Sequence, residues 1–331
     1  MYLTIVINGT VLEEYEGVQI KNQIQSLGGT VSIEGAFGSG LRIKCGDIVD
    51  IKHNAFPVFF GVVVRTEREI SQSGGNSKSI YCVDFLGLLD DCQLPNYRTY
   101  QRMSVVNIFK NITNHIKNKD WFDCIEPKPT VVERFETNAS ESVAVTCGRL
   151  AFYTDNYVFA RGNGKILFTK TNAVGVVHHR VHIGRDDITN IRHIENIQGC
   201  ADEIHGFPHS ALNIKNRFRY LVKVPKYPRN LTTPNYLIGG DTQEEVRRMC
   251  NLRKREIMND MISLEIDIAV VATTASATGG GKIFELNDNV VVADSTGKYG
   301  ELGGVYCIKA FEISQSKAKG LNTKLILGGL V

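Results

Sequence analysis

The chain has 331 residues, enough for two or three domains and a sizeable core. Hydrophobic residues make up 43% and charged residues 22%, which are ordinary values for a soluble globular protein. The formal net charge of +3 is too small to indicate a nucleic-acid or anionic-membrane partner by itself. No apolar stretch approaches the roughly 20 residues that a membrane helix needs.

The N-terminus and the cysteines favour a protein made in the cytoplasm. The first ten residues lack a basic region followed by a long apolar run, so we expect no signal peptide. The cysteines form no CxxC pair, and several occupy expected core positions. We therefore expect buried, reduced thiols. The eight cysteines are Cys45, Cys82, Cys92, Cys124, Cys147, Cys200, Cys250 and Cys307.

Residues 1–95 have the pattern of a first small β-barrel. A strand is predicted over residues 3–7 and ends at Asn8-Gly9, a hairpin signal. A glycine at position 61 indicates a bend within a buried strand. Many short strands at this spacing predict a barrel or a sandwich. The further strands are expected at 18–20, 30–33, 48–51, 59–64 and 80–85.

Residues 96–180 predict an α/β domain. Ser104 is a candidate N-cap for one helix, and Asn138 for a second helix with an apolar stripe. The second helix is followed by a hairpin that turns at Gly162-Asn163-Gly164. The Asn-Gly pair is expected to supply the positive φ angles of a type I′ turn.

A second β-barrel is predicted from residues 181–207 and 262–331, with residues 208–261 as an insertion containing one helix. Thr242 to Glu245 is a capping-box match at the start of that helix. Alternating apolar residues from Ile262 to Val270 predict a half-buried strand. The run TTASATGGG over 273–281 is expected to be a flexible loop. Residues 208–240 look irregular. We expect the two barrels to share a strand order.

The order and spacing of these elements resemble the phage baseplate hub proteins of the Mu-like and late-control D family. That family is related to the N-terminal part of type VI secretion spike proteins. The resemblance covers nearly the whole chain and depends on the order of individually weak motifs. These motifs are Asn8-Gly9, Gly46-Asp47, Gly61, the segment 83–90, the helix and hairpin of 138–170, and the runs 289–294, 304–306 and 322–327.

The resemblance implies an α+β, mostly β fold with two small barrels, an α/β domain between them and a helix-containing insertion in the second barrel. It implies a structural, non-enzymatic baseplate hub in the virion tail, made in the host cytoplasm. Two barrels per chain in a homotrimer would form a six-barrel ring that joins a three-fold spike to a six-fold tail tube. The implied partners are the spike, the tube or other baseplate proteins, and DNA only in transit.

Two patterns could bind small ligands but are better explained otherwise. The residues His178, His179 and His182 form the densest group of potential metal ligands, yet no cysteine pair lies near them in the sequence. We expect them on an exposed strand or loop. The Gly162-Asn163-Gly164 run is similar to a phosphate loop, but it precedes a strand rather than a helix. We expect no metal and no cofactor.

Two alternative functions remain open. The acidic residues Asp84, Asp90 and Asp91 could pair as the carboxylates of a tail-associated cell-wall hydrolase, although aspartate is also common at turns and caps. A basic helix could bind nucleic acid, contact a protein, or simply face solvent. Its cationic residues are Arg247, Arg248, Arg253, Lys254 and Arg255. We expect no catalytic residues.

Overall fold

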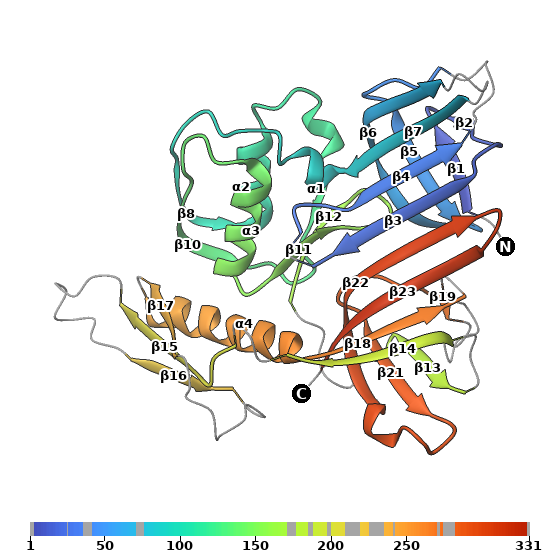
Figure 1. The fold of residues 1–331 in the computed structure, drawn as a ribbon. Coiled ribbons are helices and arrows are strands. Elements are labelled where there is room, and N and C mark those ends of the chain that lie inside the picture. Colours follow the sequence, from blue (N-terminus) through green and yellow to red (C-terminus); the bar gives the residue numbers. More distant parts are fainter. Residues whose placement is uncertain are drawn as a thin grey trace.

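The structure is a computed structural model of the chain, mostly β with four α-helices among the described residues (Figure 1). Two curled β regions lie side by side, an α/β region covers one flank, and a long helix with a small sheet extends outward. The described residues are 3–24, 26–35, 42–70, 76–170, 177–184, 188–196, 200–208, 219–224, 235–240, 242–269, 272–273 and 282–329.

The first β region contains the strands predicted in the N-terminal part of the chain. Its order across the sheet is β3-β4-β7-β6-β5-β1-β2. Burial alternates along β5, because one face of the sheet packs on the core. The strands are β1 (Leu3–Ile7), β2 (Thr10–Val11), β3 (Gly17–Gln23), β4 (Thr30–Gly35), β5 (Ile48–His53), β6 (Phe56–Ile70) and β7 (Asn76–Asp84).

The second β region contains the predicted C-terminal strands and has the order β14-β18-β23-β22-β21-β13. Two further short strands, β19 (Ala272–Thr273) and β20 (Lys282–Ile283), pair with each other. The predicted loop after Thr273 lies outside the described residues. The strands of the main sheet are β13 (His179–Ile183), β14 (Ile188–Glu195), β18 (Ile262–Ile268), β21 (Asn289–Asp294), β22 (Gly304–Ser316) and β23 (Gly320–Gly329).

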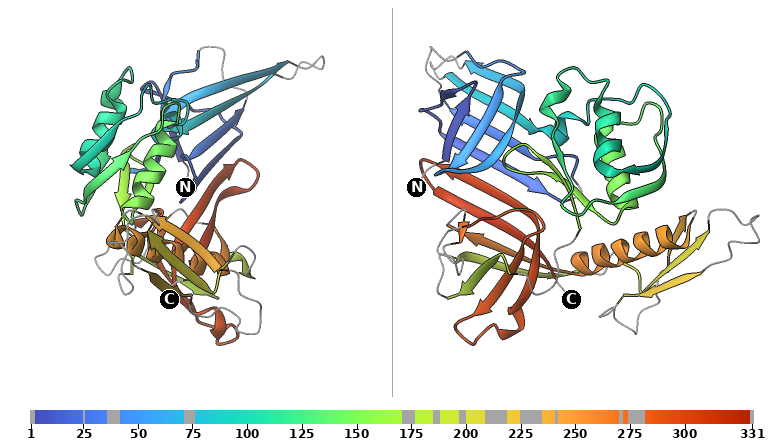
Figure 2. Two further views of the ribbon diagram at one scale, coloured as in Figure 1. Left: turned by 90° about the vertical axis from the view of Figure 1, so that its left-hand side faces the viewer. Right: turned by 180° about the vertical axis from the view of Figure 1, so that it is seen from behind.

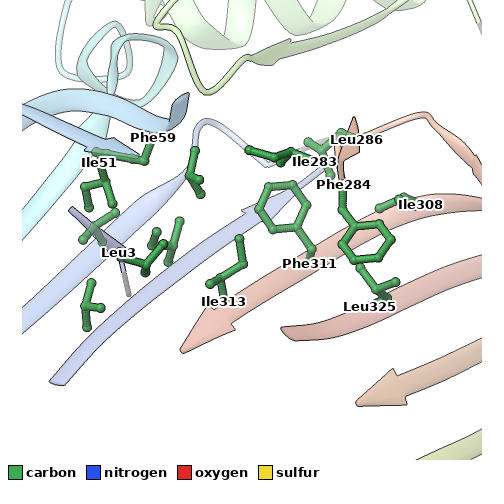
Figure 3. Close-up of a cluster of buried hydrophobic side chains, with 14 of the residues drawn as sticks. Leu3, Ile51, Phe59, Ile283, Phe284, Leu286, Ile308, Phe311, Ile313 and Leu325 are labelled. Carbon is green, nitrogen blue, oxygen red and sulfur yellow. The ribbon is translucent and has the colours of Figure 1, made fainter. Parts of the chain in front are cut away.

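The two β regions form one sheet because β22 pairs with β3 in antiparallel fashion, from Ala310 opposite Gln23 to Ser316 opposite Gly17. One hydrophobic core therefore extends across both regions (Figure 3). Leu3 and Ile51 contribute from the first region, and Phe284 and Leu325 from the second. The junction is a continuous β-sheet rather than a contact between two separate surfaces.

The α/β region follows the first β region. The helix predicted after Ser104 is confirmed, since the Ser104 hydroxyl accepts a hydrogen bond from the Asn107 N–H. The Asn138 cap is wrong. The second helix begins at Val143, and Ser142 caps it by accepting from the Val145 N–H at 3.1 Å. The elements are α1 (Phe85–Leu88), β8 (Thr99–Ser104), α2 (Val105–Thr113), η1 (Lys119–Trp121), β9 (Cys124–Ile125), β10 (Val131–Glu136), α3 (Val143–Tyr153), β11 (Tyr157–Ala160) and β12 (Ile166–Thr169).

The hairpin between β11 and β12 exists, but its turn is not type I′. Gly164 has a φ of +82°, whereas Asn163 is not among the positive-φ residues. The Arg161 N–H donates to the Lys165 carbonyl, and the Gly164 N–H donates to the Arg161 carbonyl at 2.8 Å. This is a three-residue loop with glycine in the left-handed position, which needs only one positive φ.

The region between residues 200 and 261 forms an arm, defined here as β15 (Glu203–Pro208), β16 (Tyr220–Lys223), β17 (Asn235–Gly240) and α4 (Gln243–Met261). The predicted capping box at Thr242 is confirmed. The stretch expected to be irregular contains β16 and β17. The β15 strand pairs with them rather than with the second β region. Gly206 allows α4 to pack closely on this sheet, since a Cβ there would lie 2.2 Å from Val246.

Candidate functional surfaces

The three histidines do not converge on one point. His179 is fully buried, and its Nε2 lies 3.0 Å from Oδ2 of Asp288. The Nδ1 of His178 accepts from the Asn289 N–H at 3.0 Å, and the ring of His182 faces Ser295. The prediction that all three are exposed is wrong for His179, because its ring forms part of the core beside Phe284. Within the described ranges, no group of three or more His, Cys, Asp or Glu side chains could hold a metal ion.

Asp84 and Asp90 have separate structural roles, and Asp91 is exposed. Asp84 is 3% exposed and caps α1 by accepting from the Gly87 N–H at 2.8 Å, and it also accepts from the Gly29 N–H. Burial raises the pKa of the Asp84 carboxyl to about 6, against the opposing effect of these donors. Asp90 is exposed and accepts from the Ser142 hydroxyl at 2.7 Å. These contacts are typical of aspartates at caps and turns and favour that role over a pair of hydrolase carboxylates.

The glycine loop at 162–164 contacts protein rather than presenting a helix N-terminus, because β12 follows it. Beside it, Arg161 forms an ion pair with Glu285, and its Nη2 lies 2.8 and 2.7 Å from the two carboxylate oxygens. A Cβ on Gly164 would lie 2.6 Å from Phe60. The loop therefore lies against both β regions.

The cations on α4 are largely paired within the protein. Arg248 contacts Glu244 at 3.2 Å, and Arg253 contacts Glu256 at 2.9 Å. Arg255 forms an ion pair with Asp155, which follows α3. Because these contacts bring carboxylates to the basic helix, its positive charge is balanced locally. The pairing favours a role for α4 in binding the arm to the α/β region.

The cysteines are all free thiols, and six of them are buried, as expected. Burial raises the pKa of Cys82, Cys124 and Cys307 to about 12, which keeps these thiols protonated. Cys45 is exposed and Cys92 is half-buried, so the expectation of burial does not hold for these two.

Two grooves lie at junctions between regions. One of about 730 Å³ crosses the line where β3 meets β22. Its lining includes Gln19, Ser32, Glu34, Asp267, Ser314 and Asn322. Another of about 720 Å³ lies between α3 and the arm, and its lining includes Arg134, Phe135, Arg149, Phe152, Tyr153 and Met249. Sequence patterns did not reveal either groove, since each is assembled from distant segments.

The two β regions repeat one strand order. The order β3-β4-β7-β6-β5-β1 in the first matches β14-β18-β23-β22-β21-β13 in the second. Each long hairpin has one bulged residue, Val64 in β6 and Lys309 in β22. The expectation of a shared strand order is met, with one difference in direction: β1 is antiparallel to β5, whereas β13 is parallel to β21.

The turn before β5 in the first region is repeated before β21 in the second. The Gly46 N–H donates to the Val63 carbonyl at 2.8 Å, and the Asn287 N–H donates to the Ile308 carbonyl at 2.9 Å. Gly46 and Asn287 both have positive φ angles. The bulge and this turn together provide a residue-by-residue correspondence between the two regions.

None of the helices in the described part of the chain is long and apolar enough to span a membrane.

No family model and no curated protein matches the chain. Several solved structures do resemble it. A tail protein from Neisseria meningitidis MC58 is 13% identical with a TM-score of 0.81, over 99% of this chain and 96% of that one. The 43 kDa tail protein of prophage MuSo2 from Shewanella oneidensis is also 13% identical, with a TM-score of 0.76 over 98% and 97%.

A third likeness extends beyond phages. An Escherichia coli protein described as a type VI secretion component, with structural similarity to the bacteriophage T4 tail proteins gp27 and gp5, is 9% identical with a TM-score of 0.62. The match covers 99% of this chain and 77% of that protein. At such low identity these likenesses concern the fold. The chain has the fold of these phage tail proteins, as the resemblance in its sequence predicted.

Proposed function

We propose that this protein is a structural baseplate hub of a phage tail or a related contractile injection machine. Three copies form a ring of six β-barrels that joins a three-fold spike to a six-fold tail tube. The fold shared with phage tail proteins and a type VI secretion component supports this role. It is a non-enzymatic role in the tail baseplate of the virion, and the protein is made in the host cytoplasm.

The observation that carries the proposal is the repeated strand order of the two β regions and the way they join. The regions meet head to tail, because the long strand of the second pairs with an early strand of the first. A contact of this kind uses different surfaces on the two sides, so it can repeat around a ring. A chain with two such regions needs three copies for a pseudo-six-fold ring.

In this proposal the ring wall consists of residues 1–95 as one barrel, and residues 181–207 with 262–331 as the other, except that β15 belongs to the arm. The α/β domain of residues 96–180 and the insertion of residues 208–261 are peripheral. The partners are the spike, the tail tube or other baseplate proteins. DNA passes through the ring in transit.

The test is the mass and symmetry of the purified protein, alone and with its spike. Multi-angle light scattering is expected to give three times the mass of 36.8 kDa. Class averages from electron microscopy are expected to show a six-lobed ring. The interface should bury more than about 2,000 Å² in total and survive moderate salt. A compact monomer at micromolar concentration, with no ring beside the spike, would overturn the proposal.

The alternative functions have no comparable support. Asp84 serves as a buried cap while Asp90 is bonded to Ser142, an arrangement unlike a pair of hydrolase carboxylates. Arg248, Arg253 and Arg255 are paired with carboxylates, which disfavours a nucleic-acid surface on α4. Peptidoglycan turnover that Asp84→Asn abolishes would nevertheless support the hydrolase. Salt-dependent duplex binding lost on neutralising Arg247 and Arg248 would support the nucleic-acid module.

A further inference from the structure

The internal junction between β22 and β3 provides a template for a contact between copies. Residues 304–307 of β22 pair with β21, and the outer edge from Ala310 to Ser316 pairs with β3. In this register Ser314 lies opposite Gln19 and Glu312 lies opposite Lys21. Lys21 and Glu312 form an ion pair at 3.8 Å. The junction thus combines backbone pairing with complementary charge.

The counterpart of the outer edge of β22 lies on β6. Alignment of the bulged residues Val64 and Lys309 makes Glu69 equivalent to Ser314. The β5 strand pairs with β6 only from Phe56 to Val62. Within the described ranges, no strand pairs with the outer edge of β6 from Arg65 onward. The left view of Figure 2 shows the hairpin of β6 and β7, in blue, extending away from the body of the molecule.

The counterpart of β3 is β14. Arg192 lies opposite Glu265 of β18, and Gln19 lies opposite Ser32 of β4. Because Glu265 and Ser32 occupy matching positions in the two regions, Arg192 is equivalent to Gln19. The β14 strand is the outermost strand of the 13-stranded sheet, and in the described part of the chain its second edge has no partner strand. Each copy therefore exposes one counterpart of the β22 edge, on β6, and one counterpart of the β3 edge, on β14.

We propose that the outer edge of β6 pairs with β14 of a second copy, in antiparallel fashion and in the register of the internal junction. Glu69 then lies opposite Arg192 of the next copy, Arg68 opposite His193, and Thr66 opposite Glu195. This inference rests on the proposed trimeric ring, and it identifies the strands and the register that close it. In a trimer, three such contacts pair each outer β6 edge with the β14 edge of a neighbouring copy.

The charges on the two edges fit this register. Glu69 and Arg192 are both exposed, and opposite charges directly across an antiparallel pair stabilise it. Arg68 is diagonal to Glu195 on the same face, within reach of its long side chain. Arg192 lies 3.9 Å from Glu265, which also holds Lys324 at 2.8 Å. Arg192 can therefore turn to a new partner while Glu265 keeps a cation.

An unpaired edge also needs a partner for a general reason. Exposed strand edges present rows of unsatisfied N–H and C=O groups that bind other strands. The internal register satisfies the row on the outer edge of β22 in the second β region and the row on β3 in the first. The same register between copies would satisfy the corresponding rows on β6 and β14.

Disulfide trapping tests the register directly. The doubly substituted chain Glu69→Cys with Arg192→Cys is prepared in a Cys45→Ser background, because Cys45 is exposed. Directly opposite residues of paired strands lie within the Cα separation that a disulfide needs. Mild oxidation is expected to produce covalent trimers on a non-reducing gel, and reductant should return them to monomers.

Two matched controls accompany it. Gln19→Cys with Ser314→Cys places the equivalent pair across the internal junction, so it should cross-link within one chain and leave the mass unchanged. Glu69→Cys with His193→Cys shifts the register by one residue and puts the thiols on opposite faces, so it should not cross-link.

The outcomes separate this inference from the proposed function. A trimer by light scattering without a covalent product from the 69/192 pair would overturn the strand pairing and leave the hub proposal standing. Covalent products that stop at dimers would also overturn it, because a head-to-tail contact cannot stop there. A chain that remains monomeric would overturn both.

Charge reversal provides a second measurement. Glu69→Lys and Arg192→Glu, each alone, should weaken trimerisation severalfold, and their combination should restore it. Equal weakening in the combined variant would contradict the proposed pairing.

Discussion

In the first β region, the turn before β5 leaves Asp47 only half-buried, and its carboxylate accepts from the Asn8 amide at 2.6 Å. In the second, the equivalent turn before β21 places Asp288 in the interior, 3.0 Å from Nε2 of His179. The backbone hydrogen bonds of the two turns correspond one to one. The same turn therefore tolerates a half-buried aspartate in one region and a buried one in the other.

The neighbouring strand accounts for this difference. β1 runs antiparallel to β5 and ends in the hairpin turn that carries Asn8. β13 runs parallel to β21, which places His178 and His179 at its start beside Asn289 and Asp288. A repeated strand order can thus have different polar interiors, because the direction of one strand decides which side chains meet.

The largest expected effect on stability comes from truncating a core side chain where the two β regions join. Ile313 is fully buried in β22 and lies opposite Ile20 of β3. Ile313→Ala should lower the free energy of unfolding by about 2–5 kcal/mol, because it leaves a cavity in the shared core. Urea denaturation measures the loss. The neighbouring Ser314→Ala is the control and should change stability by less than about 0.5 kcal/mol. Equal losses would mean that the junction does not share one core.

A second prediction uses a titratable group that only the first region has. Asp84 lies opposite Gly61, and the equivalent residue of the second region is Gly329, opposite Tyr306. The folded pKa of Asp84 is raised to about 6 from 3.8, so the native state binds more protons than the unfolded state between these values. Its contribution is therefore favourable at low pH and is lost as pH rises through about 6.

The matched variant is Asp84→Asn, which does not titrate. The stability of the wild type relative to this variant should fall between pH 4.5 and 7.5 by on the order of 2 kcal/mol. Chemical denaturation at both pH values measures this difference. A relative stability that stays constant or rises over this range would show that the carboxyl is not shifted upward.

A third prediction tests the two aspartates directly. Asp288→Ala removes a buried carboxylate from His179 and should cost about 1–3 kcal/mol. Asp47→Ala removes exposed hydrogen bonds to Asn8 and the Lys44 N–H and should cost no more than about 1 kcal/mol. Urea midpoints of the two variants provide the comparison. The reverse ranking would contradict the difference in burial described for the two turns.

The smallest effect concerns the hairpin that contacts both regions. Gly164 has a φ of +82° and lies against Phe60, so Gly164→Val should cost roughly 1–2 kcal/mol. A thermal melt measures the change, and surviving protein should still assemble. Gly148 provides the control, since it lies in α3 with nothing near its added Cβ. Gly148→Ala should stabilise the protein by about 0.5–1 kcal/mol. An unchanged melting temperature for Gly164→Val would show that the turn tolerates a β-branched residue.

Much of the local structure was predictable because its causes are local. The alternation from Ile262 onward identified β18, and the capping box at Thr242 and the N-cap at Ser104 identified the starts of two helices. The hydroxyl of Ser142 was missed in favour of Asn138, because both are good caps and only the path of the chain between them distinguishes the two. Likewise, an Asn-Gly pair is compatible with both turn types, and the number of residues between the paired strands decided which one forms.

The sequence by itself determined most strands of the two β regions, the starts of α2 and α4, and the resemblance to baseplate hubs. The tertiary structure alone decided that β15 joins the arm, that His179 is buried, and that β22 pairs with β3. The burial of His179 and the pairing of β22 with β3 depend on partners far away in the chain, and β15 pairs with β16 and β17, two strands in a stretch expected to be irregular. A strand's own residues specify which face is buried, but backbone N–H and C=O groups are alike in every strand. The choice of neighbour therefore follows from the packing of the whole sheet.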